Sequence, residues 1–590
     1  MAGRRKQSLL DGALILSAAI IAVKLIGVFF KLYVTLKIGY DGRGYYATAY
    51  NIYTPIYSIA LAGFPTAVSK MVAAKAAAGK YRDVKALFGI SMRIFTIAGA
   101  AGTVLILLLA YPFTKSIKSL DSIPSVLAIA PSMFFCCVMS GYRGYYQGLR
   151  DMTPSAISQV LEAGGKLVFG WLLINSVMGT GAVFADKLPV LRDMVTDAGQ
   201  SYAAAAAIMG VTIGSLMGLL YLIFRHMLIG TGIPAAAIRR APHAASKSVL
   251  TREFIAIAIP ISVSALVSNL TTLIDNWTVQ NRLQYVLDTS YDVVAGMYPG
   301  IVSARGFLPE LSESFKAYLF GSYDTVLEIK NIVPTFTITL GLSAIPVLSE
   351  AWVKRDKKTI RRSVNSVIRI TMLLAMPAGI GMAALSKEIL YLLYGTSEAN
   401  APAIPYIAPI LTMYGISVIF LALNQPITNM LQAIDRMDVP IKAMAIGATL
   451  KIVANYLLVS IPTVNIRGAV IGSLLCNIVI DAYGMIVLRR DARMKFNYRA
   501  LFLNPLLCAL ASGLAAFIIS KAANLFIKDT VMAPSFLCAR NVVTVISVLA
   551  AGGVYVFALF FTRSVRKEDI LSLPKGEKIA KVLEKRGWIG

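Results

Sequence analysis

The feature that most constrains the fold is a series of apolar runs, each about 20 residues long, that recurs from one end of the chain to the other. A helix of that length crosses the hydrocarbon core of a bilayer, because it rises 1.5 Å per residue. Soluble domains contain about 25% charged residues, whereas this chain contains 15% and has a mean hydropathy of +0.69. The sequence therefore predicts an all-α polytopic membrane protein.

The apolar runs predict about fourteen transmembrane helices. Proline and glycine inside several of them are tolerated where membrane helices pack against neighbours. The basic N-terminus leads into the first run without a small-residue cleavage site, so we expect that helix to be retained. The predicted spans are 12–36, 45–69, 86–112, 124–146, 153–176, 201–224, 253–278, 321–350, 363–386, 403–430, 440–461, 467–488, 501–522 and 541–562.

The net charge of +27 could indicate nucleic-acid binding, but no basic soluble domain of useful size remains outside the apolar runs. We assign cations near a span end to the adjoining loop and place the N-terminus inside. The cytoplasmic segments then hold 36 of the 57 Lys and Arg residues and the external segments hold 14. This bias predicts a plasma-membrane protein with both termini cytoplasmic and anionic lipids as partners, and no nucleic acid.

Metal and disulfide chemistry find no support in the sequence. The five cysteines are odd in number and lie in or beside apolar runs, and the two histidines lie together in one basic loop. We therefore expect no metal site and no cofactor. The tail segment 575–588 has an apolar side surrounded by lysines, which favours an interfacial amphipathic helix or a solvated basic tail. The external stretch 279–320 has no clear assignment.

An internal repeat relates the two halves of the chain. Aligning Gln147 with Gln432, an offset of 285, places KLVFGWLLI (166–174) on KIVANYLLV (451–459). A second match, at an offset of 276, places 91–102 on 367–378 and pairs Arg93 with Arg369. Helices 1–6 and 7–12 are thus predicted to form two lobes of the same orientation, which is the parallel-repeat design of transporters. The turn QGLRDMTP (147–154) would join helices 4 and 5, with Tyr145 and Tyr146 as interface anchors.

The repeat sets the predicted domain boundaries. They are an N-lobe at 1–226, a basic cytoplasmic linker at 227–251, a C-lobe at 252–490, helices 13 and 14 at 491–563, and a cytoplasmic amphipathic tail at 564–590. We expect a monomer.

Cations inside the predicted spans are the candidate binding residues. Each would cost about 3 kcal/mol at a helix centre facing lipid, so they must snorkel, pair or line a wet cavity. Lys24 and Lys31 share one face of helix 1, because seven residues make two turns. Unpaired cations at the centre of a two-lobed bundle suit an anion such as pyrophosphate. The seven are Lys24, Lys31, Arg93, Lys166, Lys330, Arg369 and Lys451.

Acids inside the spans are fewer. Glu162 lies four residues before Lys166, a favourable spacing for an ion pair on one helix face. Asp275 ends helix 7, and Asp481 lies in helix 12. Glu162 either neutralises Lys166 or, with Asp275 and Asp481, is a candidate for coupling transport to an ion.

Several motifs together resemble the polysaccharide-flippase branch of the MOP exporter superfamily, in particular the stage V sporulation protein B and MurJ-type lipid II flippases. The resemblance covers essentially the whole chain at low identity, and the helix 4–5 motif is its most specific part. The motifs are KLIG and FFKLY in 24–33, GFPTAVSKMVAA (63–74), GYYQGLRDMTPSAISQVLE (144–162) and SAIPVLSEA (343–351).

This resemblance implies a fourteen-helix transporter whose lobes enclose a cationic cavity and move an undecaprenyl-pyrophosphate-linked saccharide outward, with helices 13 and 14 forming a groove for the lipid tail. Lys24, Lys31 and Lys330 fall at or near the family's cavity cations, although lysine lacks arginine's bidentate grip. Some members bind sodium through helices 7 and 11, where Asp275 and Asn455 stand. Lys451, one turn before Asn455, departs from a sodium site, and coupling to sodium or protons stays open.

Two other functions fit a polytopic protein of this size. A cation-coupled multidrug exporter of the related multidrug branch needs acids facing its cavity, but here cations outnumber acids within the spans. A membrane glycosyltransferase or polymerase needs a metal motif or large polar loops, and the sequence has no DxD pair. The residues therefore favour a flippase and not an enzyme.

Overall fold

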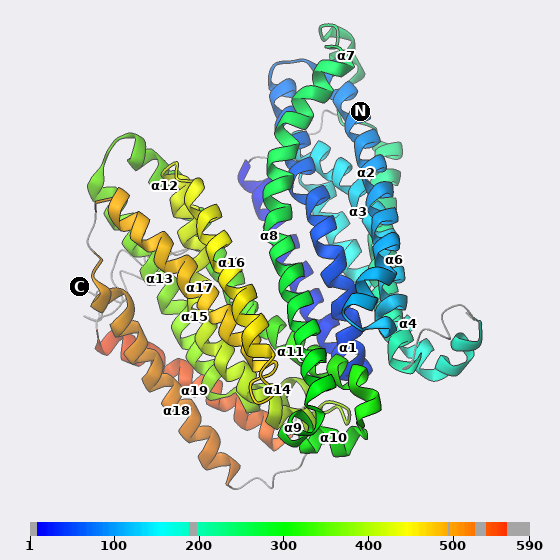
Figure 1. The fold of residues 1–590 in the computed structure, drawn as a ribbon. Coiled ribbons are helices and arrows are strands. Elements are labelled where there is room, and N and C mark those ends of the chain that lie inside the picture. Colours follow the sequence, from blue (N-terminus) through cyan, green and yellow to red (C-terminus); the bar gives the residue numbers. More distant parts are fainter. Residues whose placement is uncertain (1–8, 188–197, 494–495, 526–537, 563–590) are drawn as a thin grey trace. The chain divides into compact units, whose positions relative to one another are not determined.

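The computed structural model describes residues 9–187, 198–493, 496–525 and 538–562 (Figure 1). These described residues are nearly all helical and include no strand. Eleven of their helices are long and apolar enough to cross a membrane, and the predicted total of fourteen is not tested. The predicted tail helix at 575–588 lies outside the described residues.

The helices follow one another with short connections. In chain order the elements are α1 (Leu9–Ala77), α2 (Tyr81–Ser116), η1 (Leu120–Ser122), α3 (Ile123–Gly148), α4 (Thr153–Lys187), α6 (Ala198–Ile229), α7 (Ala235–Arg240), α8 (Lys247–Thr289), α9 (Tyr291–Met297), α10 (Pro299–Arg305), η2 (Pro309–Leu311), α11 (Ser312–Lys330), α12 (Ile332–Val353), α13 (Lys357–Ala384), α14 (Ser386–Tyr394), η3 (Ala401–Ala403), α15 (Ile404–Ala433), α16 (Asp438–Val459), α17 (Arg467–Asp491), η4 (Arg499–Leu503), α18 (Asn504–Asn524) and α19 (Ala539–Phe561).

Element α1 contains the first two predicted spans. Its 69 residues would make a straight helix about 100 Å long, more than three times the thickness of the hydrocarbon core. The backbone leaves helical geometry at Gly39, where φ is 66° and ψ is −175°. Glycine adopts this conformation without a Cβ penalty, so one run of helix becomes two.

The predicted span 321–350 is wrong as a single helix. The structure divides it at Asn331, between α11 and α12. Pro334 explains the division, because proline has no N–H to donate and its ring clashes with the carbonyl four residues earlier, which is that of Lys330. The stretch 279–320, which had no sequence assignment, contains the end of α8, the short helices α9 and α10, the turn η2 and the start of α11.

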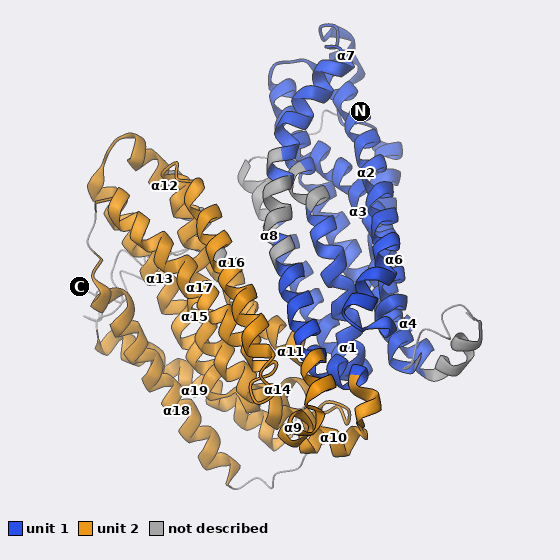
Figure 2. Cartoon of the chain, in the orientation of Figure 1, with its two compact units in different colours: residues 1–284, 313–321 blue, residues 285–312, 322–590 orange. Residues whose placement is uncertain are grey.

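The chain forms two compact units. Unit 1 contains residues 1–284 and 313–321, and unit 2 contains 285–312 and 322–590 (Figure 2). Helix α11 is divided between them, with its first part in unit 1 and its last part in unit 2.

Both units pack their helices in the same order. In unit 1, α3 contacts α1, α2 and α6, and α6 contacts α4. In unit 2, α15 contacts α12, α13 and α17, and α17 contacts α16. Helices α18 and α19 pack on each other and on α13 of unit 2, outside this shared pattern. The packing therefore agrees with a repeated lobe followed by two additional helices.

Backbone geometry reproduces the offset of 285. Arg150, between α3 and α4, and Asp435, between α15 and α16, both adopt left-handed backbone with φ of 61°. In each turn the next residue donates its N–H to the carbonyl five residues earlier, at 3.0 Å in unit 1 and 2.9 Å in unit 2. This is the long hydrogen bond of a Schellman helix ending, and it confirms this part of the repeat.

The offset of 276 is reproduced in the same way. Gly79, between α1 and α2, has φ of 70°, and Arg355, between α12 and α13, has φ of 55°. The residue after each donates its N–H to the carbonyl five residues earlier, at 2.9 Å in both units. Two offsets are needed because the connections between these turns differ in length.

Candidate functional site

The predicted cations belong to both units. Lys24, Lys31, Arg93 and Lys166 lie in unit 1, and Lys330, Arg369 and Lys451 lie in unit 2. Each half of the candidate site is described within its own unit.

The first part of α1 presents Lys24 and Lys31. Lys24 is exposed and Lys31 is half-buried. Gly27 lies between them, and a Cβ added there would have nothing within 4 Å. This open position leaves room for a group to approach the helix between the two ammonium groups.

Lys166 of α4 lies in an aromatic cage formed with α1. Its Nζ donates a hydrogen bond to the Tyr50 hydroxyl at 3.2 Å. The same Nζ lies 4.8 Å from the ring centroid of Phe30 and 5.5 Å from that of Tyr50. Ring faces attract a cation through their quadrupole, and they add no negative charge. The ammonium group is therefore held in place by neutral groups.

Of the two alternatives for Glu162, pairing with Lys166 is not the one that the structure shows. Glu162 Oε2 accepts a hydrogen bond from Arg143 of α3 at 2.8 Å, and Arg143 Nε also donates to Ser158 at 2.9 Å. A planar guanidinium suits a carboxylate better than an ammonium group does. Arg143 is absent from the predicted membrane cations because it lies near the end of its predicted span. The tertiary contact between α3 and α4 leaves no short-range sequence signal.

A row of tyrosines continues from this cage along α1. Tyr46, Tyr50, Tyr53 and Tyr57 are spaced by four, three and four residues, which places them on one helix face. Successive ring centroids lie 4.9, 6.2 and 4.8 Å apart. The spacing is visible in the segment YYATAYNIYTPIY (45–57), so the sequence contains this signal although the predicted site is built from charged residues alone.

Arg93 and Arg369, which the repeat pairs, have different surroundings. Arg93 is exposed on α2 and lines a surface pocket. Arg369 is buried within unit 2, with 3% of its surface exposed. The repeat therefore conserves the position of the guanidinium group but not its access to solvent.

The unit 2 half also holds a lysine over a tyrosine. Lys330, at the end of α11, places Nζ 4.5 Å from the ring centroid of Tyr414 in α15. The Tyr414 hydroxyl donates to the hydroxyl of Tyr323 at 2.8 Å. The break at Asn331 places Lys330 at a helix end, a position that a continuous span 321–350 did not predict.

The candidate coupling residues Asp275, Asn455 and Asp481 are buried, whereas Glu162 is half-buried. Asp275 lies in α8 of unit 1, and Asn455 lies in α16 of unit 2. Gly472 of α17 approaches Asn455 so closely that a Cβ there would collide with its Oδ1. No group of three or more acidic, histidine or cysteine residues suited to a metal occurs in the described part of the chain.

Asp481 of α17 is the candidate acid that is buried without hydrogen-bond partners for its carboxylate among the described residues. Its side chain is 4% exposed, and neither carboxylate oxygen has a hydrogen-bond partner among the described residues. One turn earlier, Asn477 donates to Ser417 and accepts from Asn424, at 3.3 and 2.9 Å. Most buried polar groups are hydrogen-bonded, so Asp481 stands out among the candidate acids.

The turn between α3 and α4 is held by buried tyrosines. Tyr145 and Tyr146 are fully buried, so the prediction that they are interface anchors is wrong. Their hydroxyls bond the Thr231 carbonyl and His226 Nδ1, both at 2.9 Å. Buried tyrosine hydroxyls need such partners. Pro154 is the second residue of α4, where its missing N–H costs no helical hydrogen bond.

Comparisons with known proteins agree with this architecture. The sequence model of the polysaccharide biosynthesis protein family matches residues 9–352, and that of the lipid II flippase MurJ matches residues 332–564. The lipid II flippase MurJ of Bacillus subtilis is 24% identical over 572 residues, which cover 93% of this chain and 94% of that protein. Stage V sporulation protein B of the same species is 24% identical over 585 residues, or 96% and 98% of the two chains.

Solved structures show the same fold at lower identity. An inward-facing multidrug resistance MATE family transporter of the MOP superfamily superposes with a TM-score of 0.60 at 14% identity, covering 78% of this chain and 94% of that one. Lipid II flippase MurJ in an inward closed conformation gives a TM-score of 0.57 at 14% identity, covering 93% of this chain and 99% of that one.

Proposed function

Because the chain belongs to the polysaccharide biosynthesis protein family of the MOP superfamily, we propose that it moves a polyprenyl-pyrophosphate-linked saccharide from the inner to the outer leaflet of the plasma membrane. Membership of this superfamily makes the chain a multi-span membrane transporter and not an enzyme. The relatives named for lipid II transport support lipid II or a related cell-wall precursor as the cargo.

The observation that supports this cargo best is the aromatic cage of Lys166. Glu162, the acid nearest to Lys166 in sequence, is already paired with Arg143. Lys166 is held by a hydroxyl and two ring faces, so its positive charge remains available to a pyrophosphate. The exposed Lys24 and half-buried Lys31 add cations in unit 1, and Lys330, Arg369 and Lys451 add cations in unit 2. A multidrug exporter for organic cations would need the opposite charge.

The proposed mechanism is alternating access without bond making. The pyrophosphate head enters from the cytoplasmic side, the cations offset its charge, and the two units rock to expose it outside. The polyprenyl tail remains in lipid, with α18 and α19 as its proposed path. No cofactor takes part, and a monomer suffices.

Replacing Lys166 tests the cargo. Lys166→Glu should reduce transport by at least about 100-fold, because it replaces the cation with an acid beside the substrate's own negative charge, whereas Lys166→Arg should retain most activity. Lys442→Gln is the matched control, since Lys442 is an exposed lysine that pairs with Asp438 within its own helix. The measurement is precursor accumulation on the inner leaflet in a strain lacking its lipid II flippase. Full transport by Lys166→Glu would refute the cationic site.

Asp481 is the proposed proton carrier if transport is proton-coupled. Asp481→Asn should make precursor transport in proteoliposomes insensitive to an imposed pH gradient, because the amide cannot release a proton. Coupling that persists unchanged in this variant would exclude Asp481, and sodium dependence in its place would direct attention to Asp275 and Asn455.

A further inference from the structure

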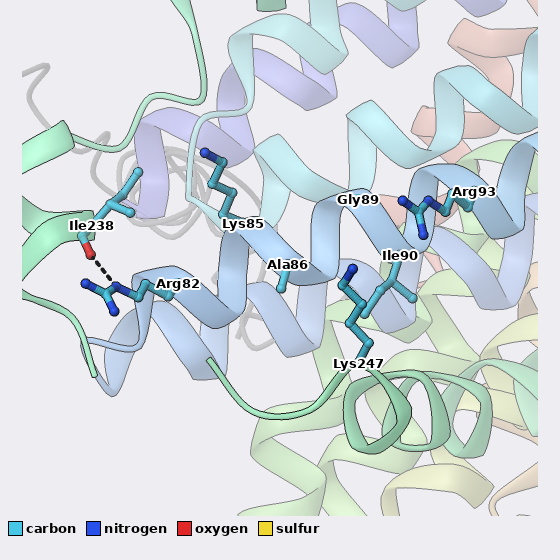
Figure 3. Close-up of a pocket in the computed structure, with 8 residues that line it drawn as sticks. All are labelled: Arg82, Lys85, Ala86, Gly89, Ile90, Arg93, Ile238 and Lys247. Atoms are coloured by element: carbon cyan, nitrogen blue, oxygen red, sulfur yellow. Dashed lines mark hydrogen bonds between the residues drawn. The ribbon is translucent and has the colours of Figure 1, made fainter. Parts of the chain in front are cut away.

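A basic pocket lies at the N-terminal end of α2 and shares no residue with the aromatic cage of Lys166. It has a volume of about 470 Å³ and is lined by Arg82, Lys85, Ala86, Gly89, Ile90, Arg93, Ile238 and Lys247 (Figure 3). Four of these eight residues are cationic and none is acidic. All eight belong to unit 1.

The segment that contributes Ile238 to the pocket is fixed to α2 by hydrogen bonds. Arg82 Nε donates to the carbonyl of Ile238 at 3.1 Å, and its Nη2 donates to that of Arg239 at 3.0 Å. The neighbouring Asp83 accepts a hydrogen bond from the Ala245 N–H at 2.8 Å. Arg82 and Asp83 thus hold α7 and the following segment in place. The pocket is built by the fold and does not arise from loose surface chains.

The other three cations carry uncompensated charge. Lys85, Arg93 and Lys247 are exposed and form no ion pair with any residue in the described part of the chain. Figure 3 shows Lys247 extending toward Ile90 of α2, with Arg93 further along that helix. The nearby Glu253 is already paired with Lys75 at 2.9 Å. Like charges gathered without a counter-ion repel one another, so the pocket favours an anion.

The helix face that leads out of the pocket is apolar. Lys85, Gly89 and Arg93 are spaced by four residues, and the same face continues through Ile97 and Leu108. Ile97 and Leu108 are 69% and 70% exposed. A ligand with a phosphate group at one end and acyl chains at the other matches this order of basic pocket and apolar face. A soluble phosphate has no acyl chains that could contact the apolar face.

We propose that this pocket binds the phosphate group of an anionic phospholipid of the inner leaflet, with the acyl chains along α2. Arg93 supplies a planar donor fork, and Lys85 and Lys247 act as point charges. Since Lys247 begins α8 while Lys85 and Arg93 belong to α2, the bound lipid ties these two helices together. The pocket contains Arg93 but none of the other predicted cations, so the proposal moves Arg93 from the transport site to a lipid site and does not depend on the identity of the cargo.

Gly89 permits a sharp test. A Cβ added at Gly89 would have nothing within 4 Å, so a larger side chain is accommodated. Gly89→Glu places a carboxylate four residues from both Lys85 and Arg93, where it pairs with them and occupies the pocket. Gly89→Gln has the same shape without the charge and is the matched control.

The experiment titrates purified full-length protein with phosphatidylglycerol or phosphatidylcholine and counts bound lipids by native mass spectrometry. The wild type and Gly89→Gln should retain phosphatidylglycerol preferentially, and Gly89→Glu should bind it about tenfold more weakly. The triple variant Lys85→Gln, Arg93→Gln, Lys247→Gln should lose the same preference. Equal retention by Gly89→Glu and Gly89→Gln would overturn the proposal.

A second arm identifies the source of the phosphate. Inorganic pyrophosphate is titrated by calorimetry into the same variants. If pyrophosphate binds the wild type and Gly89→Gln but not Gly89→Glu, and the protein shows no preference for phosphatidylglycerol, the ligand is a soluble phosphate. That result would overturn the proposal. Because the readout is lipid retention, loss of transport in Lys166→Glu does not affect this result.

Discussion

The two units close equivalent turns with ion pairs of opposite polarity. In unit 1 the acid is in the turn, and Asp151 pairs with Arg225 near the end of α6 at 2.7 Å. In unit 2 the base is in the turn, and Arg436 pairs with Asp491 at the end of α17. Asp151 and Arg436 are 285 residues apart, which is the repeat offset. The repeat has therefore kept the backbone turn and the existence of a pair, but not the sign of either charge.

The two pairs differ in burial. The side chain of Arg225 is 5% exposed, whereas that of Arg436 is 32% exposed. Arg225 also lies 4.3 Å from the ring centroid of Tyr146, and Arg436 instead has a second acid, Asp438, at 3.1 Å. A buried charge that loses its partner is far more costly than an exposed one. The turn of unit 1 should therefore tolerate the loss of one charge of its ion pair less well than the turn of unit 2.

The largest expected effect is at Asp151. Asp151→Asn should lower the free energy of unfolding by about 3 kcal/mol, because it leaves the guanidinium of Arg225 buried without a counter-charge. The measurement is SDS-induced unfolding in mixed micelles. The exchange Asp151→Arg with Arg225→Asp, which copies the polarity of unit 2, should recover at least half of the loss. If the double variant is no more stable than Asp151→Asn, the acid and the base of this pair cannot exchange positions in unit 1.

An intermediate effect is expected at the seam between α4 and α6. A Cβ at Gly214 would meet the backbone of Glu162 and Lys166. Gly214→Ala should therefore cost about 2 kcal/mol through overpacking and displace the cage of Lys166. Gly164→Ala is the control on the facing helix, since a Cβ there has nothing within 4 Å. Equal thermal midpoints for the two variants would contradict the close packing of this seam.

The smallest expected effect is at Arg436. Arg436→Gln should lower the free energy of unfolding by less than about 1 kcal/mol, because the pair is partly exposed and Asp491 keeps a hydrogen bond from Arg490 at 2.8 Å. The same SDS titration gives the value beside that of Asp151→Asn. A loss of unfolding free energy as large as that of Asp151→Asn would contradict the proposal that burial of the ion pair decides how costly the loss of one charge is.

Local sequence signals predicted the parts of the fold that depend on hydrophobic length and backbone turns. Apolar runs predicted most of the helices. The offset of 285 predicted the turn of Arg150 and its counterpart at Asp435, and the turns of Gly79 and Arg355 are related by the other offset, 276. These features depend on residues close in sequence, so a single chain reveals them.

Features that depend on competition between distant groups were not predictable. Glu162 had a suitable lysine four residues away, but Arg143 of another helix binds it. Tyr145 and Tyr146 had the composition of interface residues, but partners after α3 take their hydroxyls into the interior. Only the folded arrangement decides which of several acceptable partners wins.

Helix α11 is clamped in unit 1 by Lys316, whose Nζ donates to the carbonyls of Ile117 and Lys118 at 2.5 Å each. Beyond Gly321 the same helix belongs to unit 2, where Tyr323 accepts a hydrogen bond from Tyr414. One helical backbone therefore carries side-chain hydrogen bonds of both units, the first part within unit 1 and the last part within unit 2.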